Sequence, residues 1–280
     1  MCGRYTVVTQ LKVIEERFQV SAAEGLETVQ NPNVCPGELA PVITSDAPSE
    51  LRLLRFGLTP SWAQKPMLLI NARAEGDQNT DDNPHYTGGM GILQKPAFRK
   101  PIRSQRCLVI ADAFIEGPKE AKLKEPWLVY PRHGLAPFAM AGVWDAYADP
   151  RTGEIIHSFA IVTTVANPLL QAIGHHRSPV ILPRSAEHLW LDTSVPIAEV
   201  SALLRPFDAD DFNAYRIDPA VKSVYEKSAA VLSPVGELLY PNYRFVLSQE
   251  LKLEGMGMTT ARKRKSGEDK TPDGGQLSLF

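Results

Sequence analysis

The second residue of the chain is a cysteine that could carry chemistry which no internal cysteine has. If Met1 is removed, which is usual before a small residue, Cys2 presents a thiol beside a free α-amine. Such an aminothiol condenses with an aldehyde: the amine forms an imine, and the thiol then closes a five-membered thiazolidine ring. An α-amine has a pKa of about 7.7–8.0 and a thiol one of about 8.5, so both groups are available near neutral pH. Taken alone, a cysteine is more often a buried small hydrophobic residue.

Five segments, in the correct order, resemble motifs of the SOS response-associated peptidase family, the abasic-site processing proteins. They are MCGRY at residues 1–5, RFGLTPSWA at 55–63, NARAE at 71–75, RCLVIADAFIE at 106–116 and HHRSPVIL at 175–182. Each motif is short, but the five together span roughly residues 2–190. Their order makes the resemblance specific, and it supplies an aldehyde as the substrate, namely the ring-opened deoxyribose of an abasic site.

The resemblance implies four catalytic residues: Cys2, Asn71, Glu116 and His175. Glu116 would move a proton for the α-amine, and His175 would protonate sugar oxygens. Asn71 carries an amide that can hold the amine or a sugar hydroxyl. His175 is chosen over the adjacent His176 because it keeps the family spacing to the following arginine. Without the motifs, Glu116 could be a surface acid, His175 a structural histidine and Asn71 a turn residue.

The same motifs suggest where DNA binds. Arg4 and Arg73 carry planar guanidinium groups that fit phosphate oxygens, although both could form ordinary salt bridges instead. Trp62 could stack on a base beside the lesion, with Pro36 on the other side, although a lone tryptophan is more often in a core. A further basic cluster is either a DNA-facing patch or a solvated face. It consists of Arg99, Lys100, Arg103 and Arg106.

Composition limits the class of protein. The chain has 280 residues, of which 44% are hydrophobic, enough for one sizeable core in one domain with appendages. Its three cysteines form no even framework and show no metal-ligand spacing, so we expect a reducing compartment and no metal. We also expect no cofactor. The expected location is the bacterial cytoplasm, at the nucleoid when the protein is on DNA. No stretch is apolar enough to cross a membrane. The net charge of −2 requires that any DNA-binding surface be a local patch.

Short runs rich in β-branched and aromatic residues predict strands at residues 51–56, 107–111, 127–130, 138–142 and 155–164. Helices are predicted from residue 11 to 18, from Asn167-Pro168 to Ile173, and from 187 to 191 after a cap at Ser185. Because helices do not alternate regularly with strands, the fold class is a strand-dominated α+β domain. The family resemblance implies a curved, barrel-like β core with flanking helices.

The expected domain covers residues 2–254, and the family match is clearest over 2–190. Residues 76–91 form a polar, turn-rich run that we interpret as a surface loop inserted relative to the family. Residues 255–280 have the composition of a disordered tail. The last five residues resemble the peptide that binds the bacterial sliding clamp: Gln276, Leu277, Ser278, Leu279 and Phe280.

The sequence therefore predicts a DNA-damage protein that forms a covalent thiazolidine crosslink between Cys2 and abasic sites in single-stranded DNA, and lyase and thiol peptidase or autopeptidase activities are further expectations. Its expected partners are this DNA and a sliding clamp, with no membrane. One alternative is an N-terminal-nucleophile cysteine peptidase, since Cys2 with a base could also open an amide. Another is a non-catalytic reader of modified DNA, which would bind DNA equally well after Cys2→Ser.

Overall fold

The computed structural model describes residues 2–132 and 134–240. Its strands are β1 Tyr5–Val7, β2 Ser21–Ala22, β3 Asn31–Val34, β4 Leu39–Thr44, β5 Ala47–Phe56, β6 Asn71–Arg73, β7 Arg106–Ala111, β8 Ala113–Glu116, β9 Trp127–Pro131, β10 Phe138–Ala148, β11 Ile155–Val165, β12 Arg177–Pro179 and β13 Phe212–Arg216. Its α-helices are α1 Leu11–Phe18, α2 Pro101–Ser104, α3 Pro168–Ala172, α4 Glu187–Leu191 and α5 Ile197–Ser201. Its 3-10 turns are η1 Gly91–Leu93, η2 Lys122–Lys124, η3 Arg184–Ala186, η4 Ala209–Asp211, η5 Pro219–Lys222 and η6 Ala229–Leu232.

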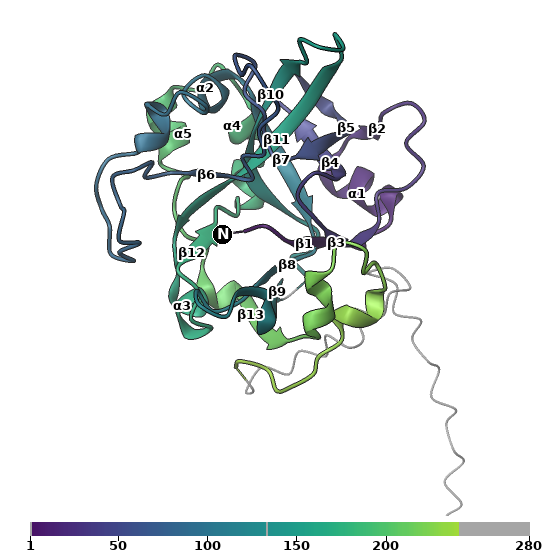
Figure 1. Ribbon diagram of the computed structural model, residues 1–280, viewed down its shortest axis with the longest axis vertical. Helices are drawn as coiled ribbons and strands as arrows, with labels where there is room; N and C mark the ends of the chain where they lie inside the picture. Colours follow the sequence, from purple (N-terminus) through teal and green to yellow (C-terminus); the bar gives the residue numbers. More distant parts are fainter. Residues whose placement is uncertain (1, 133, 241–280) are drawn as a thin grey trace, which may run out of the picture.

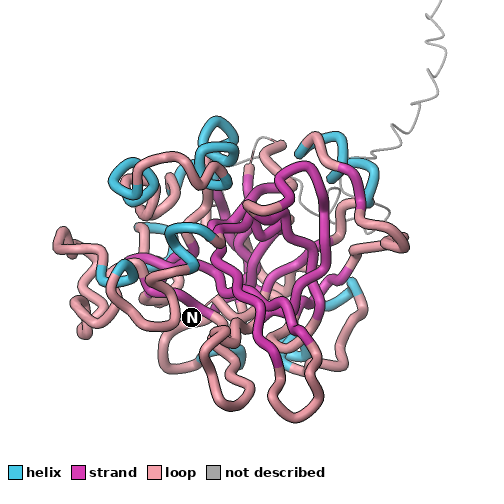
Figure 2. Tube along the Cα trace, turned by 90° about the horizontal axis from the view of Figure 1, so that it is seen from above, coloured by secondary structure: helices cyan, strands magenta, loops and turns pink. Residues whose placement is uncertain are grey.

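Five strands close into a barrel. β5, β4, β7, β10 and β11 pair in that order as antiparallel neighbours. β11 then pairs in parallel with β5, through Ser158 opposite Arg55 and Phe159 opposite Phe56, and this last pairing completes the ring. Closure removes the two exposed edges that an open sheet would leave. Figure 2 shows the strands at the centre of the molecule and the short helices around them.

A second sheet of five strands lies beside the barrel in the order β13-β9-β8-β1-β3. In this sheet β1 is an interior strand, because it pairs with β8 on one side and with β3 on the other. Figure 1 shows the N-terminal segment entering β1 from the middle of the molecule. The start of the chain is therefore held on both sides by backbone hydrogen bonds.

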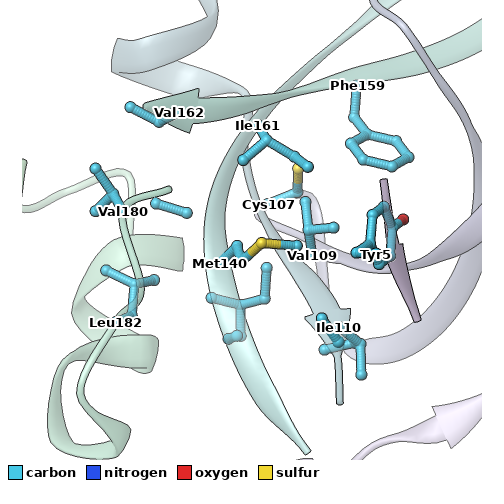
Figure 3. Close-up of a cluster of buried hydrophobic side chains, with 14 of the residues drawn as sticks. Tyr5, Cys107, Val109, Ile110, Met140, Phe159, Ile161, Val162, Val180 and Leu182 are labelled. Carbon is cyan, nitrogen blue, oxygen red and sulfur yellow. The ribbon is translucent and has the colours of Figure 1, made fainter. Parts of the chain in front are cut away.

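The hydrophobic core fills the space between the strands. Side chains from β1, β7, β10, β11 and the residues after β12 point toward one another in Figure 3. Phe56 stacks on Phe159 across the strand pair that closes the barrel, with ring centroids 5.3 Å apart, and Tyr5 meets Phe56 edge-on at 5.6 Å. Aromatic pairs of this kind stabilise a core by about 0.5–1.5 kcal/mol beyond the burial of their area. Here they join β1 to the closing strands.

These observations confirm the strand-dominated α+β fold with a barrel-like core, and each predicted strand is present, extended at one or both ends. Asn167 caps α3 as predicted, since its side chain accepts a hydrogen bond from Leu170 N. The predicted cap at Ser185 is wrong: a 3-10 turn precedes α4, whose N-cap is Ala186 and whose first turn has no side-chain cap. No helix in the described part of the chain is long and apolar enough to cross a membrane.

The interpretation of Arg106 as part of a surface cluster is also wrong. Its side chain is 1% exposed. The guanidinium donates to the backbone oxygens of Trp190, in the last turn of α4, and of Asp192, which follows the helix. A charged group can be buried only where other polar groups replace water, and these carbonyl oxygens do so. Arg106 therefore anchors the end of α4 to β7.

Candidate active site

Strand pairing brings Cys2 to Glu116. In the antiparallel pair of β1 and β8, Tyr5 lies opposite Phe114, and Ile115 N donates to Arg4 O. Continuing this register places Gly3 opposite Glu116, so Cys2 lies just beyond the end of β8. The Cys2 side chain is buried, and a hydrogen bond links it to the Glu116 carboxyl.

Glu116 and His175 form a buried pair. His175 Nε2 lies 3.3 Å from Glu116 Oε2, and both side chains are almost fully buried. On the other side of the ring, Nδ1 lies 2.7 Å from Gly117 O. Because a carbonyl oxygen only accepts, Nδ1 carries the proton and the Nε2 lone pair faces the carboxyl group. The proton between the two side chains is therefore one that Glu116 can hold.

Burial shifts the pKa values of both groups of this pair so that their neutral forms are favoured. It raises the pKa of the Glu116 carboxyl to about 7 and lowers the pKa of the His175 imidazole to about 3. Burial, reinforced by the Glu116 carboxylate, also raises the pKa of the Cys2 thiol well above its usual value. The site thus holds a neutral thiol and a neutral imidazole beside a carboxyl group that exchanges a proton near neutral pH.

The end of α3 positions His175. Gly174 has a φ of +76°, which favours glycine, and it terminates the helix. Gly174 N donates to Gln171 O, and His175 N donates to Leu170 O, the two hydrogen bonds of a Schellman motif. The turn directs His175 back toward β8. His175 is thus the histidine that pairs with Glu116, whereas His176 Nε2 lies 3.8 Å from Asp82 Oδ2.

Asn71 and Arg73 reach the site from β6. This strand pairs in parallel with β11, with Asn71 opposite Ile161 and Arg73 opposite Thr163. Residues two apart point to the same face of a strand, so both side chains face the site. Asn71 Nδ2 donates to Cys2 O at 3.0 Å, and Asn71 Oδ1 is buried without a hydrogen bond among the described residues. This oxygen is positioned to accept a hydrogen bond from a ligand.

The four predicted catalytic residues therefore come together. Asn71, Glu116 and His175 line a cavity of about 990 Å³, and Cys2 lies buried beside them. The cavity also collects cations, among them Arg4, Arg73, Lys119, Lys122, Arg177 and Lys222. Such an arrangement can accept a polyanion and move protons at its floor. In the described ranges no group of histidine, cysteine, aspartate and glutamate side chains is arranged to hold a metal ion.

Arg4 lines the cavity, but its guanidinium also binds the protein itself. It donates to Asn33 Oδ1 at 3.0 Å, to Val221 O at 3.0 Å and to Lys222 O at 2.8 Å. These contacts hold η5 against the start of the chain. Phosphate binding by Arg4 stays a prediction.

The two residues proposed to flank a base are placed differently. Pro36 lines the cavity. Trp62 lies in the loop that connects β5 to β6, is 56% exposed and donates from Nε1 to Pro96 O at 3.3 Å. It is not part of the cavity lining, although its exposed ring is available for stacking.

Sequence reasoning assigned no role to a buried ion pair between two of the motifs. Arg177 Nη2 lies 2.7 Å from Glu75 Oε2, and Nη1 lies 3.2 Å from Oε1, with both side chains almost fully buried. The pair joins the segment after β6 to β12 and so fixes the wall of the cavity. Its only sequence signal was the presence of opposite charges in two motifs.

A second group that sequence reasoning missed surrounds Asp82, which belongs to the polar run at residues 76–91. Its carboxylate lies 2.9 Å from Arg73 Nη2, 3.5 Å from Lys119 Nζ and 3.9 Å from Arg177 Nη1. The Asp82 side chain is only 11% exposed. An acidic residue thus sits among the cations of the cavity wall.

Comparisons with known proteins show the family of the chain. Residues 1–224 match the family described as SOS response associated peptidase (SRAP). The abasic site processing protein YoqW of Bacillus subtilis is 32% identical over 240 residues, which cover 83% of this chain and 99% of that protein. The abasic site processing protein HMCES of Gallus gallus is 28% identical over 236 residues, which cover 72% of this chain and 66% of that protein.

The fold also matches solved structures. A crystal structure of a protein from Bacteroides thetaiotaomicron superimposes with a TM-score of 0.69 at 27% identity and covers 84% of this chain and all of that one. A protein from Bordetella bronchiseptica, at 22% identity and a TM-score of 0.58, shares the fold.

Proposed function

Because the chain belongs to the SOS response-associated peptidase family, whose curated relatives are named abasic site processing proteins, we propose that it joins Cys2 covalently to the ring-opened sugar of abasic sites in single-stranded DNA. One observation carries the proposal. The second residue of the chain is a cysteine, and it lies buried against a carboxyl group and an imidazole that can share a proton, beside a cation-lined cavity. That cysteine becomes an aminothiol once Met1 is removed.

The reaction balances without a cofactor. The α-amine of Cys2 attacks the aldehyde carbon, and the carbonyl oxygen leaves as water with the two amine protons, which gives an imine. The thiol sulfur then bonds to the imine carbon, and the thiol proton ends on the nitrogen. The product is a thiazolidine, so the net change is loss of one water molecule from amine, thiol and aldehyde.

The neighbouring groups suit these proton transfers. Glu116, with a pKa of about 7, can take a proton from the amine or the thiol and return it to the leaving oxygen. His175, neutral at physiological pH, can pass a proton between Glu116 and the sugar. The buried Oδ1 of Asn71 can accept a hydrogen bond from the amine or a sugar hydroxyl. Arg73 lines the cavity, and its guanidinium group can bind a phosphate there.

The intact mass of the purified protein, measured before and after incubation with an abasic oligonucleotide, tests this proposal. We expect a chain that lacks Met1 and gains the mass of the oligonucleotide less one water. Cys2→Ala should form no stable adduct, and neither should a variant with one residue added before Cys2, although it keeps the thiol. An undiminished adduct from the extended variant would exclude the thiazolidine. Turnover of a peptide with no adduct would favour the N-terminal-nucleophile peptidase.

We also propose that the end of the chain recruits the protein to a bacterial sliding clamp. Residues 276–280 read Gln-Leu-Ser-Leu-Phe, which is similar to the clamp-binding peptide. The segment lies outside the described residues, so the proposal rests on its sequence alone. Leu279 and Phe280 would fill an apolar pocket while Gln276 binds at its rim, and the preceding residues would act as a tether.

A further inference from the structure

The two ends of the loop formed by residues 76–91 lie in close contact. A Cβ atom on Gly76 would lie 2.8 Å from Gly91 C, and one on Gly91 would lie 2.3 Å from Glu75 O. Only glycine allows the two ends to approach this closely. The loop leaves β6 at the wall of the cavity and returns to η1. In Figure 1 the blue trace that follows β6 leaves the strands and runs to the left edge of the molecule.

Internal hydrogen bonds fix the part of the loop that faces the cavity. Asn79 is buried; its Oδ1 accepts from Asn83 N at 2.9 Å, and its Nδ2 donates to Asn83 O at 3.1 Å. Arg73 Nη2 donates to Asn79 O at 2.6 Å. These contacts surround Asp82, which adopts a φ of +55°. Aspartate tolerates this conformation better than most residues do, yet it is still an unusual one.

The contacts of Asp82 are those that a phosphate would make. Arg73 comes from β6, Lys119 follows β8, and Arg177 begins β12, and these three cations approach one carboxylate from separate elements. His176 Nε2 adds a fourth group at 3.8 Å. Guanidinium and ammonium groups bind carboxylate and phosphate oxygens with the same geometry. The cluster is therefore an anion site that the protein fills with its own side chain.

We infer that the loop formed by residues 76–91 competes with DNA for this site: Asp82 occupies the position of a backbone phosphate between Arg73, Lys119 and Arg177, and DNA binds when the loop withdraws. The inference rests on the proposed function, because it takes DNA as the ligand of the cavity. It adds that the free protein is held in a self-blocked state. The apparent dissociation constant for DNA then equals the intrinsic one divided by the fraction of molecules with the loop withdrawn.

The matched pair Asp82→Asn and Asp81→Asn tests the inference. Asparagine also tolerates a positive φ, so Asp82→Asn removes the carboxylate without adding strain. Asp81 is the exposed neighbour in the same loop, and its replacement changes the net charge by the same amount. The general electrostatic attraction to DNA therefore rises equally in both variants.

The probe is a fluorescein-labelled single-stranded oligonucleotide without an abasic site, so that binding stays reversible, and the readout is fluorescence anisotropy at fixed ionic strength. We expect Asp82→Asn to bind about tenfold more tightly than Asp81→Asn. This factor corresponds to a loop that is withdrawn in about one tenth of the molecules when Asp82 is present and in nearly all of them when it is replaced. Affinities equal within about twofold, or weaker binding by Asp82→Asn, would overturn the inference. Thermal unfolding confirms that each variant is folded.

A second variant keeps the test decisive if Asp82→Asn unfolds. Because the loop ends touch, residues 77–90 can be replaced by a short Gly-Ser connection, which should tighten binding at least as much as Asp82→Asn. Weaker binding after this replacement would show that the loop helps to hold DNA, and would refute the competition.

Adduct formation with an abasic oligonucleotide separates this inference from the proposed function. If the wild-type protein forms the adduct but Asp82→Asn binds no better than Asp81→Asn, the loop inference fails alone. If Asp82→Asn binds more tightly but no adduct forms with any variant, the crosslinking proposal fails alone. If no variant binds DNA or forms an adduct, both fail. When both hold, Asp82→Asn should lower the protein concentration needed for half-maximal adduct formation without changing the limiting rate.

Discussion

At the scale of single residues, the Glu116–His175 pair combines two opposite pKa shifts. Burial raises the pKa of Glu116 from 4.5 to about 7, and it lowers the pKa of His175 from 6.5 to about 3. Between pH 4.5 and 6.5 the folded pair holds a proton on the carboxyl group, whereas the unfolded chain holds it on the imidazole. The two contributions to the pH dependence of stability therefore oppose each other in this range.

Glu116→Gln should remove the contribution of Glu116 to the pH dependence of stability and leave that of His175. From pH 4.5 to about 7 the folded wild-type protein keeps a proton on Glu116 that the unfolded chain has lost, so the stability contribution of Glu116 is full below pH 4.5 and falls as the pH rises. The variant does not lose this stability as the pH rises, because glutamine has no titratable proton to release. The stability of Glu116→Gln relative to wild type should therefore rise across this window, by on the order of 3 kcal/mol, in thermal and urea unfolding at several pH values.

The control for this experiment is Glu120→Gln, which removes an exposed carboxyl group from the lining of the same cavity. Its stability relative to wild type should stay nearly constant over the same pH range. A flat profile for Glu116→Gln as well would mean that Glu116 is ionised in the folded protein at pH 5. The proton-sharing arrangement with His175 would then be wrong.

The sequence motifs predicted which residues assemble around Cys2, because motif residues of one family are selected together. They could not predict that Asp82 enters the site. That contact depends on the close approach of Gly76 to Gly91 and on long-range ion pairs, and neither has a local signal in the sequence. Packing also explains why a glycine follows Glu116. A Cβ on Gly117 would lie 1.9 Å from Lys122 O.

At the scale of elements, two short segments set the geometry of the site. β1 is held between β8 and β3, which fixes Cys2, and the Schellman motif at the end of α3 fixes His175. α3 spans only five residues, so its own stability is small and tertiary contacts must hold it. The glycine at its end is therefore a point where a small change should alter the site.

Gly174→Ala and Gly153→Ala form a matched pair for this prediction. The two glycines have nearly equal φ values, +76° and +75°, so each substitution should cost roughly 1–2 kcal/mol of unfolding free energy. Gly153 lies in the turn between β10 and β11, with nothing within 4 Å of its added Cβ, whereas a Cβ on Gly174 would meet Pro118 Cβ at 3.3 Å. Gly174→Ala alone should slow adduct formation, by roughly tenfold, because His175 shifts.

Single-turnover adduct assays and urea unfolding of both variants measure the two effects separately. Equal adduct rates for Gly174→Ala and Gly153→Ala would show that the end of α3 does not control the chemistry. A large loss of rate in Gly153→Ala would instead point to general destabilisation.

The five strands β5, β7, β9, β10 and β11 were predictable because their β-branched and aromatic runs are local, whereas short strands near the site, such as β1 and β6, span only 3 residues each and are too short to show such runs. The closure of the barrel was not predictable, because it depends on the parallel pairing of β5 with β11, which lie about 100 residues apart in the chain. Alternation of residue types predicts a strand but does not identify its partner. The barrel-like shape was expected only from the family resemblance.

At the scale of the whole molecule, charge is distributed unevenly. The chain carries a net charge of −2, yet the cavity gathers arginines and lysines from β6, the segment after β8, β12 and η5. A protein with little overall attraction to DNA depends on a local site and on any device that raises its concentration near DNA. Attachment to a clamp that encircles DNA would supply such a device.

A peptide of residues 274–280 should bind a purified bacterial sliding clamp with micromolar affinity, about −8 kcal/mol, as expected for a short segment that orders on binding. Leu279→Ala combined with Phe280→Ala removes both apolar anchors and should abolish the heat of binding in titration calorimetry. The same double substitution in the full chain should leave adduct formation with a free abasic oligonucleotide unchanged, because the residues proposed to carry that reaction lie between Cys2 and His175. Equal heats from the two peptides, or no heat from either, would exclude the clamp as the partner of this segment.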